Sequence, residues 1–175
     1  MITYKELKKN EDVRTYITAA DATLGALGFT EHGLGHVTKV AECVKYILET
    51  LGHTPHEVEL GQIAALLHDI GKVSTFTLDG HGQGHFYGHA EKSAEMANAI
   101  LLRLKAPTAL REDAKFLIEK HMTPLTPDKK LLRRRLSQYG ENRLRMLLRL
   151  QKADFCAKGV TGDTADTTYY WRPIL

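Results

Sequence analysis

The chain has 175 residues, of which 43% are hydrophobic and 26% are charged, and its formal net charge at pH 7 is +3. This length allows one compact domain with a core, and the composition is ordinary for a globular protein. The mild positive charge is compatible with an anionic substrate but is far too small to require nucleic acid as a partner.

Cysteine content argues against a disulfide-stabilised protein, and hydropathy argues against a secreted or membrane-spanning one. Cys43 and Cys156 form neither a C-x-x-C pair nor a disulfide framework, which indicates a reducing compartment. Residues 1–6 lack the apolar region of a signal peptide, and no apolar run is long enough to cross a bilayer. We therefore expect a cytoplasmic protein without a membrane partner.

Apolar residues recur at helical spacing along most of the chain, and no alternating strand pattern persists. Thr54-Pro55 is a helix start, and Gly28 and Gly140 are helix stops. The spacing predicts helices over 3–9, 11–27, 36–51, 55–70, 89–104, 108–121, from 127 to 140, and 141–158. We predict an all-α bundle in a single domain over 1–175, with its core over about 30–160, a helical cover over 1–29 and an irregular tail over 160–175.

One stretch, Leu66-Leu67-His68-Asp69-Ile70-Gly71-Lys72, carries the clearest chemistry. It is an apolar helix face that ends in a histidine and an aspartate, and core packing gives no reason for that ending. Imidazole nitrogen and carboxylate oxygen both bind divalent metals. A single such pair arises easily by chance, so its meaning depends on ligands elsewhere in the chain.

Three further histidines stand at predicted helix ends. His36 lies in a first turn, His89 opens a helix after the glycine-rich loop 73–88, and His121 closes another. His32 lies one turn before His36, and for it capping or packing is the better interpretation. Loop 73–88 matches neither a P-loop nor a dinucleotide fingerprint, and we expect it to cover a pocket.

Asp154 lies among the apolar positions of the last helix. A buried carboxylate needs a partner, because burying an unpaired charge is costly. Lys158, four residues later, offers a local salt bridge, whereas a metal ion is the sharper explanation.

The order His36, His68-Asp69, His89, His121 and Asp154 resembles the HD-domain superfamily of metal-dependent phosphohydrolases, over about residues 30–160. The segments Gly84-His85-Phe86-Tyr87-Gly88-His89 and Leu150-Gln151-Lys152-Ala153-Asp154 look like those of the HD domain appended to bacterial tRNA nucleotidyltransferases. The chain has no room for the nucleotidyltransferase head, so we expect a free-standing HD protein with a compact bundle of about six to eight helices around a central metal site.

The resemblance implies a ligand set. One metal would be held by His36, His68, Asp69 and Asp154, and a second by Asp69, His89 and His121, with Asp69 as the bridge. We expect one or two divalent ions per chain, drawn from Mn, Fe, Ni, Co, Mg and Zn.

Residues outside this set have more than one interpretation. Lys72 is a candidate to contact a substrate phosphate, or is solvated near a helix C-terminus. His85 is a candidate to protonate the leaving oxygen or bind phosphate, and a packing role in the loop is nearly as good. The arginine-rich stretches are best explained as solvated helix faces, in preference to a track for a polyanion: Arg133, Arg134, Arg135, Arg143, Arg145 and Arg149.

The leading hypothesis is a phosphohydrolase that cleaves a phosphomonoester or phosphodiester of nucleotide type by metal-activated water, with Asp69, Lys72 and His85 as catalytic candidates. A di-iron oxygenase of the same superfamily is the first alternative, because the ligands also suit iron. The second is a non-catalytic module that binds a nucleotide or RNA. The expected partner is a small phosphorylated substrate, and nucleic acid is less favoured.

Overall fold

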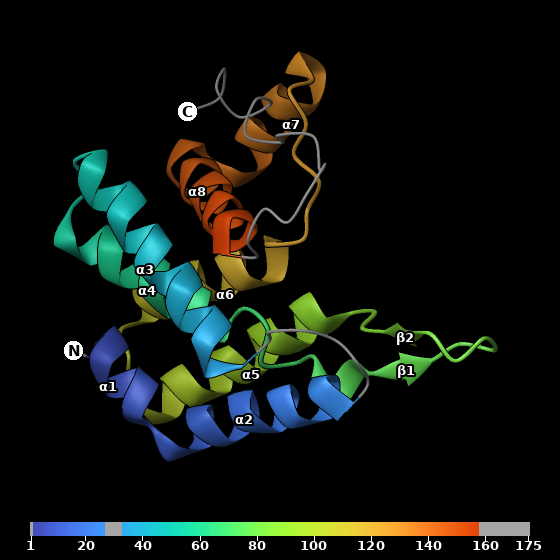
Figure 1. Cartoon of the computed structure of the whole chain (residues 1–175). Helices are drawn as coiled ribbons and strands as arrows, with labels where there is room; N and C mark the ends of the chain where they lie inside the picture. Colours follow the sequence, from blue (N-terminus) through green and yellow to red (C-terminus); the bar gives the residue numbers. More distant parts are fainter. Residues whose placement is uncertain (1, 27–32, 158–175) are drawn as a thin grey trace.

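The computed structural model describes residues 2–26 and 33–157, and there the chain forms eight α-helices and one small hairpin (Figure 1). The helices are α1 (Tyr4–Lys9), α2 (Glu11–Ala26), α3 (Leu34–Thr50), α4 (Pro55–Leu67), α5 (His89–Arg103), α6 (Thr108–Lys120), α7 (Lys129–Tyr139) and α8 (Glu141–Ala157). The predicted all-α fold is confirmed, and the predicted helix ends differ from the observed ones by a few residues at most.

The segment between α4 and α5, which the sequence indicated to be a glycine-rich loop, contains a small hairpin. After a short 3-10 turn, η1 (Val73–Thr75), the strands β1 (Thr77–Leu78) and β2 (Gly84–His85) pair antiparallel. Asp79 closes the turn, because its Oδ1 accepts the backbone N–H groups of His81 and Gln83, each at 2.9 Å. Strands of two residues leave no alternating pattern, and in Figure 1 the hairpin projects away from the helices.

Helix α4 is the central element of the bundle. Every residue from Leu60 to Ile70 is buried, and α4 packs against α1, α3, α5, α6 and α8. It starts with a capping box in which the Thr54 hydroxyl accepts the Glu57 N–H and Glu57 accepts the Thr54 N–H. A Cβ on Gly61 would lie 2.5 Å from Val44 Cγ1, so this glycine permits the close approach of α3.

Two helix pairs enclose the C-terminal end of α4. Helix α3 packs along α4 and α8, and α5 packs along α6, which in turn contacts α4 and α8. The apolar residues between these helices form one continuous core that includes Leu48, Ile63, Leu101, Leu117 and Leu147. The end of α4 is therefore inside the molecule, close to the ends of other helices.

The N-terminal helices pack on the outside of this arrangement. Leu7 of α1 and Val13 and Ile17 of α2 are buried, and an ion pair between Asp12 and Arg103 joins α2 to α5. The candidate His32, the alternative partner Lys158 and the predicted tail lie outside the described residues. Among the described residues, no helix has both the length and the apolar character needed to cross a membrane.

Four of the six arginines follow the prediction of solvated faces. Arg133 and Arg134 of α7 and Arg143 and Arg145 of α8 are exposed. Arg135 of α7 is half-buried, and its guanidinium lies over the ring of Tyr139 and donates to the Tyr139 hydroxyl at 3.0 Å. Arg149, in contrast, is only 5% exposed, so a solvated side chain was the wrong prediction there. The reason is that every residue from Met146 to Leu150 is buried, because α8 is covered on several sides at this level.

Candidate metal centre

His68 takes its position from the end of helix α4. The helix ends at Leu67, and the last backbone carbonyls of a helix lack partners within it. His68 occupies the C-cap, and its Nδ1 lies 2.8 Å from the carbonyl oxygen of Ala65, to which it donates. This bond leaves Nε2 as the nitrogen that faces Asp69.

His121 and His89 repeat the same arrangement from other elements. His121 is the C-cap of α6, and its Nδ1 lies 2.6 Å from the Ile118 carbonyl oxygen. His89 is the first residue of α5, and its Nδ1 lies 2.8 Å from the Phe86 carbonyl oxygen. Each imidazole thus uses a carbonyl three residues earlier and presents Nε2, the orientation that second-sphere hydrogen bonds give to metal-binding histidines.

Asp69 lies between two groups of histidines. Its Oδ2 is 3.3 Å from His68 Nε2, whereas its Oδ1 is 3.5 Å from His89 Nε2 and 3.7 Å from His121 Nε2. His89 Nε2 and His121 Nε2 are 3.4 Å apart. The two carboxylate oxygens therefore belong to different clusters, and Asp69 is the residue that the clusters share.

His36 and Asp154 complete the cluster on the Oδ2 side. His36, in the first turn of α3, and Asp154, near the end of α8, are brought together by the packing of these two helices. Asp154 Oδ1 is 3.2 Å from His36 Nε2 and 3.6 Å from His68 Nε2. All six residues that the sequence singled out as ligands therefore lie in one continuous group.

The donor set fits divalent cations. Ligand atoms bound about 2.1 Å from one ion lie roughly 3.0–3.4 Å apart, close to the separations observed here. His68 Nε2 is enclosed, and it makes no well-formed hydrogen bond to a described residue, although carboxylate oxygens lie nearby. A buried donor atom of this kind is costly unless an ion or another group satisfies it.

The charges of the cluster favour a cation as well. Burial alone would lower the pKa of His68, but the Asp69 and Asp154 carboxylates outweigh it and raise this pKa to about 10. Burial likewise opposes ionisation of Asp69, yet the positive groups around it hold its pKa well below the usual value. Burial lowers the pKa of His89, which keeps that imidazole neutral. The same negative field that retains a proton on His68 attracts a metal ion.

Lys72 is part of this cluster and is not solvated. Its Nζ lies 2.6 Å from Asp69 Oδ2, one turn after the aspartate, and its side chain is mostly buried. Of the two interpretations from the sequence, the solvated lysine does not agree with this position. The ammonium group places a positive charge directly beside the shared carboxylate.

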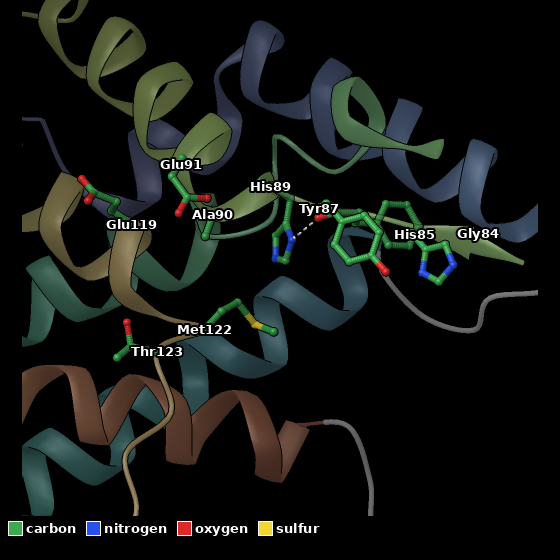
Figure 2. Close-up of a pocket in the computed structure, with 11 residues that line it drawn as sticks. Gly84, His85, Tyr87, His89, Ala90, Glu91, Glu119, Met122 and Thr123 are labelled. Carbon is green, nitrogen blue, oxygen red and sulfur yellow. Dashed lines mark hydrogen bonds between the residues drawn. The ribbon is translucent and has the colours of Figure 1, made fainter. Parts of the chain in front are cut away.

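His85 stands apart from the six. It lies on β2, and its Nε2 is 3.0 Å from Asp79 Oδ2, so the hydrogen bond of this ring is made within the hairpin. It nevertheless lines the same pocket as His89, with a volume of about 520 Å³ (Figure 2). Figure 2 shows His85 and Tyr87 on one side of His89, and Glu91 and Glu119 on the other.

Several residues at the site gave no clear signal in the sequence. Gln151 donates to the carbonyl oxygens of His121 and Thr123, at 2.8 and 2.9 Å, and so fixes the end of α6. Asp79 orients His85, and Glu91 and Glu119 line the pocket. Gln151 lies in the same helix segment as Asp154. The sequence alone does not indicate which carbonyl groups of a distant segment its side chain contacts.

The comparison with known families agrees with this geometry. The profile of one family, described as HD domain, matches residues 33–157. The chain belongs to the HD-domain family. This is the stretch that contains all six clustered residues, from the start of α3 to the end of α8.

Three curated proteins are similar to this HD-domain chain. It is 36% identical over 108 residues to an A-adding tRNA nucleotidyltransferase of Deinococcus radiodurans, covering 61% of this chain and 25% of that protein. It is 33% identical over 109 residues to a CC-adding tRNA nucleotidyltransferase of Thermus thermophilus, covering 62% and 25%. A multifunctional CCA protein of Aromatoleum aromaticum is 47% identical over 58 residues, covering 33% and 14%.

The similarity covers only part of each relative. The chain spans about a quarter of the length of the two tRNA nucleotidyltransferases. No solved structure matches the chain. The relatives therefore support the HD-domain assignment, and their own activities are not transferred to this chain by similarity alone.

Proposed function

We propose that this chain is a metal-dependent phosphohydrolase that cleaves a phosphomonoester or phosphodiester of nucleotide type in the cytoplasm. The observation that carries the proposal is the position of Asp69, whose two oxygens face two separate histidine clusters. A carboxylate placed in this way is the usual bridge between two divalent ions in phosphate-cleaving sites.

Six residues would hold the ions. His36, His68 and Asp154 would join Asp69 around one ion, and His89 and His121 would join it around a second. Such ions make a bound water acidic enough to supply hydroxide near neutral pH and offset charge on phosphate oxygens. The imidazole and carboxylate donors are compatible with Mn, Fe, Ni, Co, Mg or Zn.

Two other residues would act on the substrate. Lys72 supplies a fixed positive charge beside Asp69, where it would attract a phosphate oxygen. His85 borders the pocket, and its bond to Asp79 Oδ2 fixes the orientation of its ring. We propose that it binds the phosphate ester or donates a proton to the leaving oxygen.

The test is hydrolysis of phosphate esters by the purified chain after chelation and reloading with each candidate metal. Substrates are nucleoside monophosphates, cyclic nucleotides and para-nitrophenyl phosphate, assayed in air and under strict exclusion of oxygen. The proposal predicts hydrolysis of at least one of these esters, seen as free phosphate from a monoester or as a nucleoside monophosphate from a cyclic nucleotide. This hydrolysis requires metal, does not require oxygen, and is lost in Asp69→Asn.

Other outcomes assign the chain to the alternatives. A product that forms only in the presence of oxygen would favour the di-iron oxygenase. No reaction with any metal, together with salt-dependent and metal-independent affinity for RNA, would favour a binding module. Either result would overturn the hydrolase proposal.

A further inference from the structure

We propose that the pocket beside His89 receives the nucleoside part of a nucleotide that carries a single phosphate group, with the base against Tyr87, and that Glu91 and Glu119 exclude nucleotides with additional phosphates. This inference rests on the proposed function, which supplies the site for the phosphate itself. It names the class of substrate and the residues that select it.

The pocket has the size and the position for such a ligand. Its volume of about 520 Å³ falls within the range of small-molecule sites, roughly 300–1,000 Å³. His89, which faces Asp69 on one side, lines the pocket on the other. A phosphate held at the candidate metal centre therefore has its ester group directed into a pocket that accepts a nucleoside.

Tyr87 presents a flat aromatic surface at one end of the pocket. Its ring is stacked on His85, with centroids 5.0 Å apart and an interplanar angle of 13°, and it is 76% exposed. Asp79 fixes the orientation of the His85 ring, because its Oδ2 lies at hydrogen-bond distance, 3.0 Å, from His85 Nε2. The stack fixes the tyrosine in place while the ring stays accessible, which is how aromatic side chains receive bases.

Met122 adds a second exposed apolar side chain to the same pocket. It follows directly after His121 at the end of α6 and is 58% exposed. Single exposed apolar residues need no explanation, but here two of them line one pocket next to a candidate metal centre. A thioether packs favourably against aromatic rings, so Met122 suits a base or a ribose at this place (Figure 2).

The charges of the pocket argue against a second phosphate. Glu91 and Glu119 line it, and among its described lining residues there is no lysine or arginine. Lys120 Nζ lies 2.6 Å from Glu119 Oε1, so this lysine offsets one of the two carboxylates and the group keeps net negative charge. Carboxylates repel additional phosphates, whereas they accept hydrogen bonds from ribose hydroxyls and base amino groups.

The same charges argue against an RNA chain in this pocket. Proteins that hold a nucleic-acid backbone contact its phosphates with lysine and arginine. The exposed basic residues Lys130 and Arg134 line a different hollow, on α7, together with Asp128. A free nucleotide with one phosphate is the ligand that fits both the apolar and the acidic parts of the pocket beside His89.

The base contact is tested with Tyr87→Leu, which removes the ring, and Tyr87→Phe, which keeps it. We expect Tyr87→Leu to raise KM for AMP about tenfold more than KM for ribose 5-phosphate, which has no base, because the loss of the stack on His85 affects both substrates alike. Tyr87→Phe should behave like the wild type. Tyr46→Leu, at a similarly exposed tyrosine on α3, is the matched control. Equal losses for AMP and ribose 5-phosphate, or no loss for either, would contradict the contact.

The charge filter is tested with the double variant Glu91→Gln, Glu119→Gln and the substrates AMP and ADP. The wild type should prefer AMP by at least tenfold in kcat/KM, and the double variant should reduce this preference several-fold. Glu112→Gln, an exposed glutamate elsewhere on α6, should leave the preference unchanged. An unchanged AMP-to-ADP ratio in the double variant would overturn the role of these carboxylates.

Binding separates this inference from the proposed function. Calorimetric titration of the metal-loaded chain uses the methylene phosphonate analogue of AMP, which cannot be hydrolysed at the replaced bond, and methylphosphonate, which has neither sugar nor base. The inference predicts tighter binding of the nucleoside analogue, and loss of that advantage in Tyr87→Leu. Failure of hydrolysis with this binding intact would overturn only the hydrolase proposal. Equal binding of both probes would overturn the subsite even in an active enzyme.

Discussion

Asp69 is the residue on which the candidate site depends. It is 7% exposed, its two oxygens face histidines from three different elements, and Lys72 contacts the Oδ2 atom. Without a metal, these positive groups hold the pKa of Asp69 low and the carboxylate stays ionised. A bound divalent ion competes with the proton on His68 and with the ammonium of Lys72 for the same carboxylate.

The Lys72→Met variant tests whether the lysine serves the substrate rather than the metal. Its removal takes a competing positive charge away from Asp69, so metal affinity should be unchanged or higher. Hydrolysis should fall about 10- to 100-fold, because a charge that would contact the phosphate is lost. Metal titration and steady-state kinetics measure the two effects.

The control for this variant is Lys45→Met, an exposed lysine that pairs with Glu49 on α3. It should alter neither metal affinity nor rate. Loss of metal in Lys72→Met would show that the lysine supports the fold of the cluster instead of acting on substrate.

At the level of single elements, the start of α4 contributes to the position of its end. The Glu57 carboxylate accepts the backbone N–H and the hydroxyl of Thr54, both at 2.9 Å, and these bonds lower the pKa of Glu57 from its ordinary value of 4.5. His53 Nδ1 lies 3.2 Å from the same carboxylate and adds to this effect. A lowered carboxyl pKa stabilises the fold above pH 4.5, and this stability is lost as pH falls through the lowered value.

Glu57→Gln should therefore destabilise the protein slightly, and only while the carboxylate is ionised. We expect a loss of about 0.5 kcal/mol or less in the free energy of unfolding at neutral pH, because the side chain is about a third exposed and solvent screens its charge. The difference from the wild type should shrink as pH falls below 4.5 and disappear once the pH is below the lowered pKa of Glu57, measured by urea denaturation across pH. A difference that persists at low pH would show that the effect is steric, and Glu112→Gln controls for the loss of a surface charge.

Gly71 determines how closely α5 approaches the end of α4. A Cβ at this position would lie 2.6 Å from Ser93 N and 3.0 Å from the His89 carbonyl oxygen, both backbone atoms of α5. The Gly71 N–H also donates to Ser93 Oγ at 2.9 Å. The glycine is thus needed to keep His89 within reach of Asp69.

Gly71→Ala should push the start of α5 away from the cluster. We expect a loss of about 1–3 kcal/mol in the free energy of unfolding and weaker binding of the metal associated with His89 and His121, with the other metal retained. Gly35→Ala is the matched control, because a Cβ there meets nothing within 4 Å and alanine favours the helix. Equal behaviour of the two variants in urea denaturation and metal titration would refute this role of Gly71.

At the scale of the whole molecule, the sequence predicted the features that depend only on residues close together in the chain. Helical spacing and caps such as Thr54-Pro55 indicated the helices, because a buried apolar face and satisfied helix ends are local requirements. The candidate ligands His36, His89, His121 and Asp154 could be selected because each stood at a helix end or on an apolar face. The resemblance to the HD domain supplied the expectation that they meet.

The features that were missed depend on contacts between distant segments. Two-residue strands carry no alternating pattern, so the hairpin was not predicted. The burial of Arg149 follows from how many helices surround α8, and the roles of Glu91 and Glu119 follow from the shape of the pocket. Helical spacing identifies the apolar face of a single helix, but it does not indicate how many other helices pack around that helix.

The most direct test of the central claim is metal content per chain, measured by elemental analysis on protein purified without a metal-affinity tag. The wild type and Asp69→Asn are compared after reloading and removal of free metal. The shared carboxylate predicts about two equivalents in the wild type and a sharp fall at both positions in the variant. About one equivalent in the wild type, unchanged in Asp69→Asn, would contradict a bridging role for Asp69 and remove the basis of the proposed function.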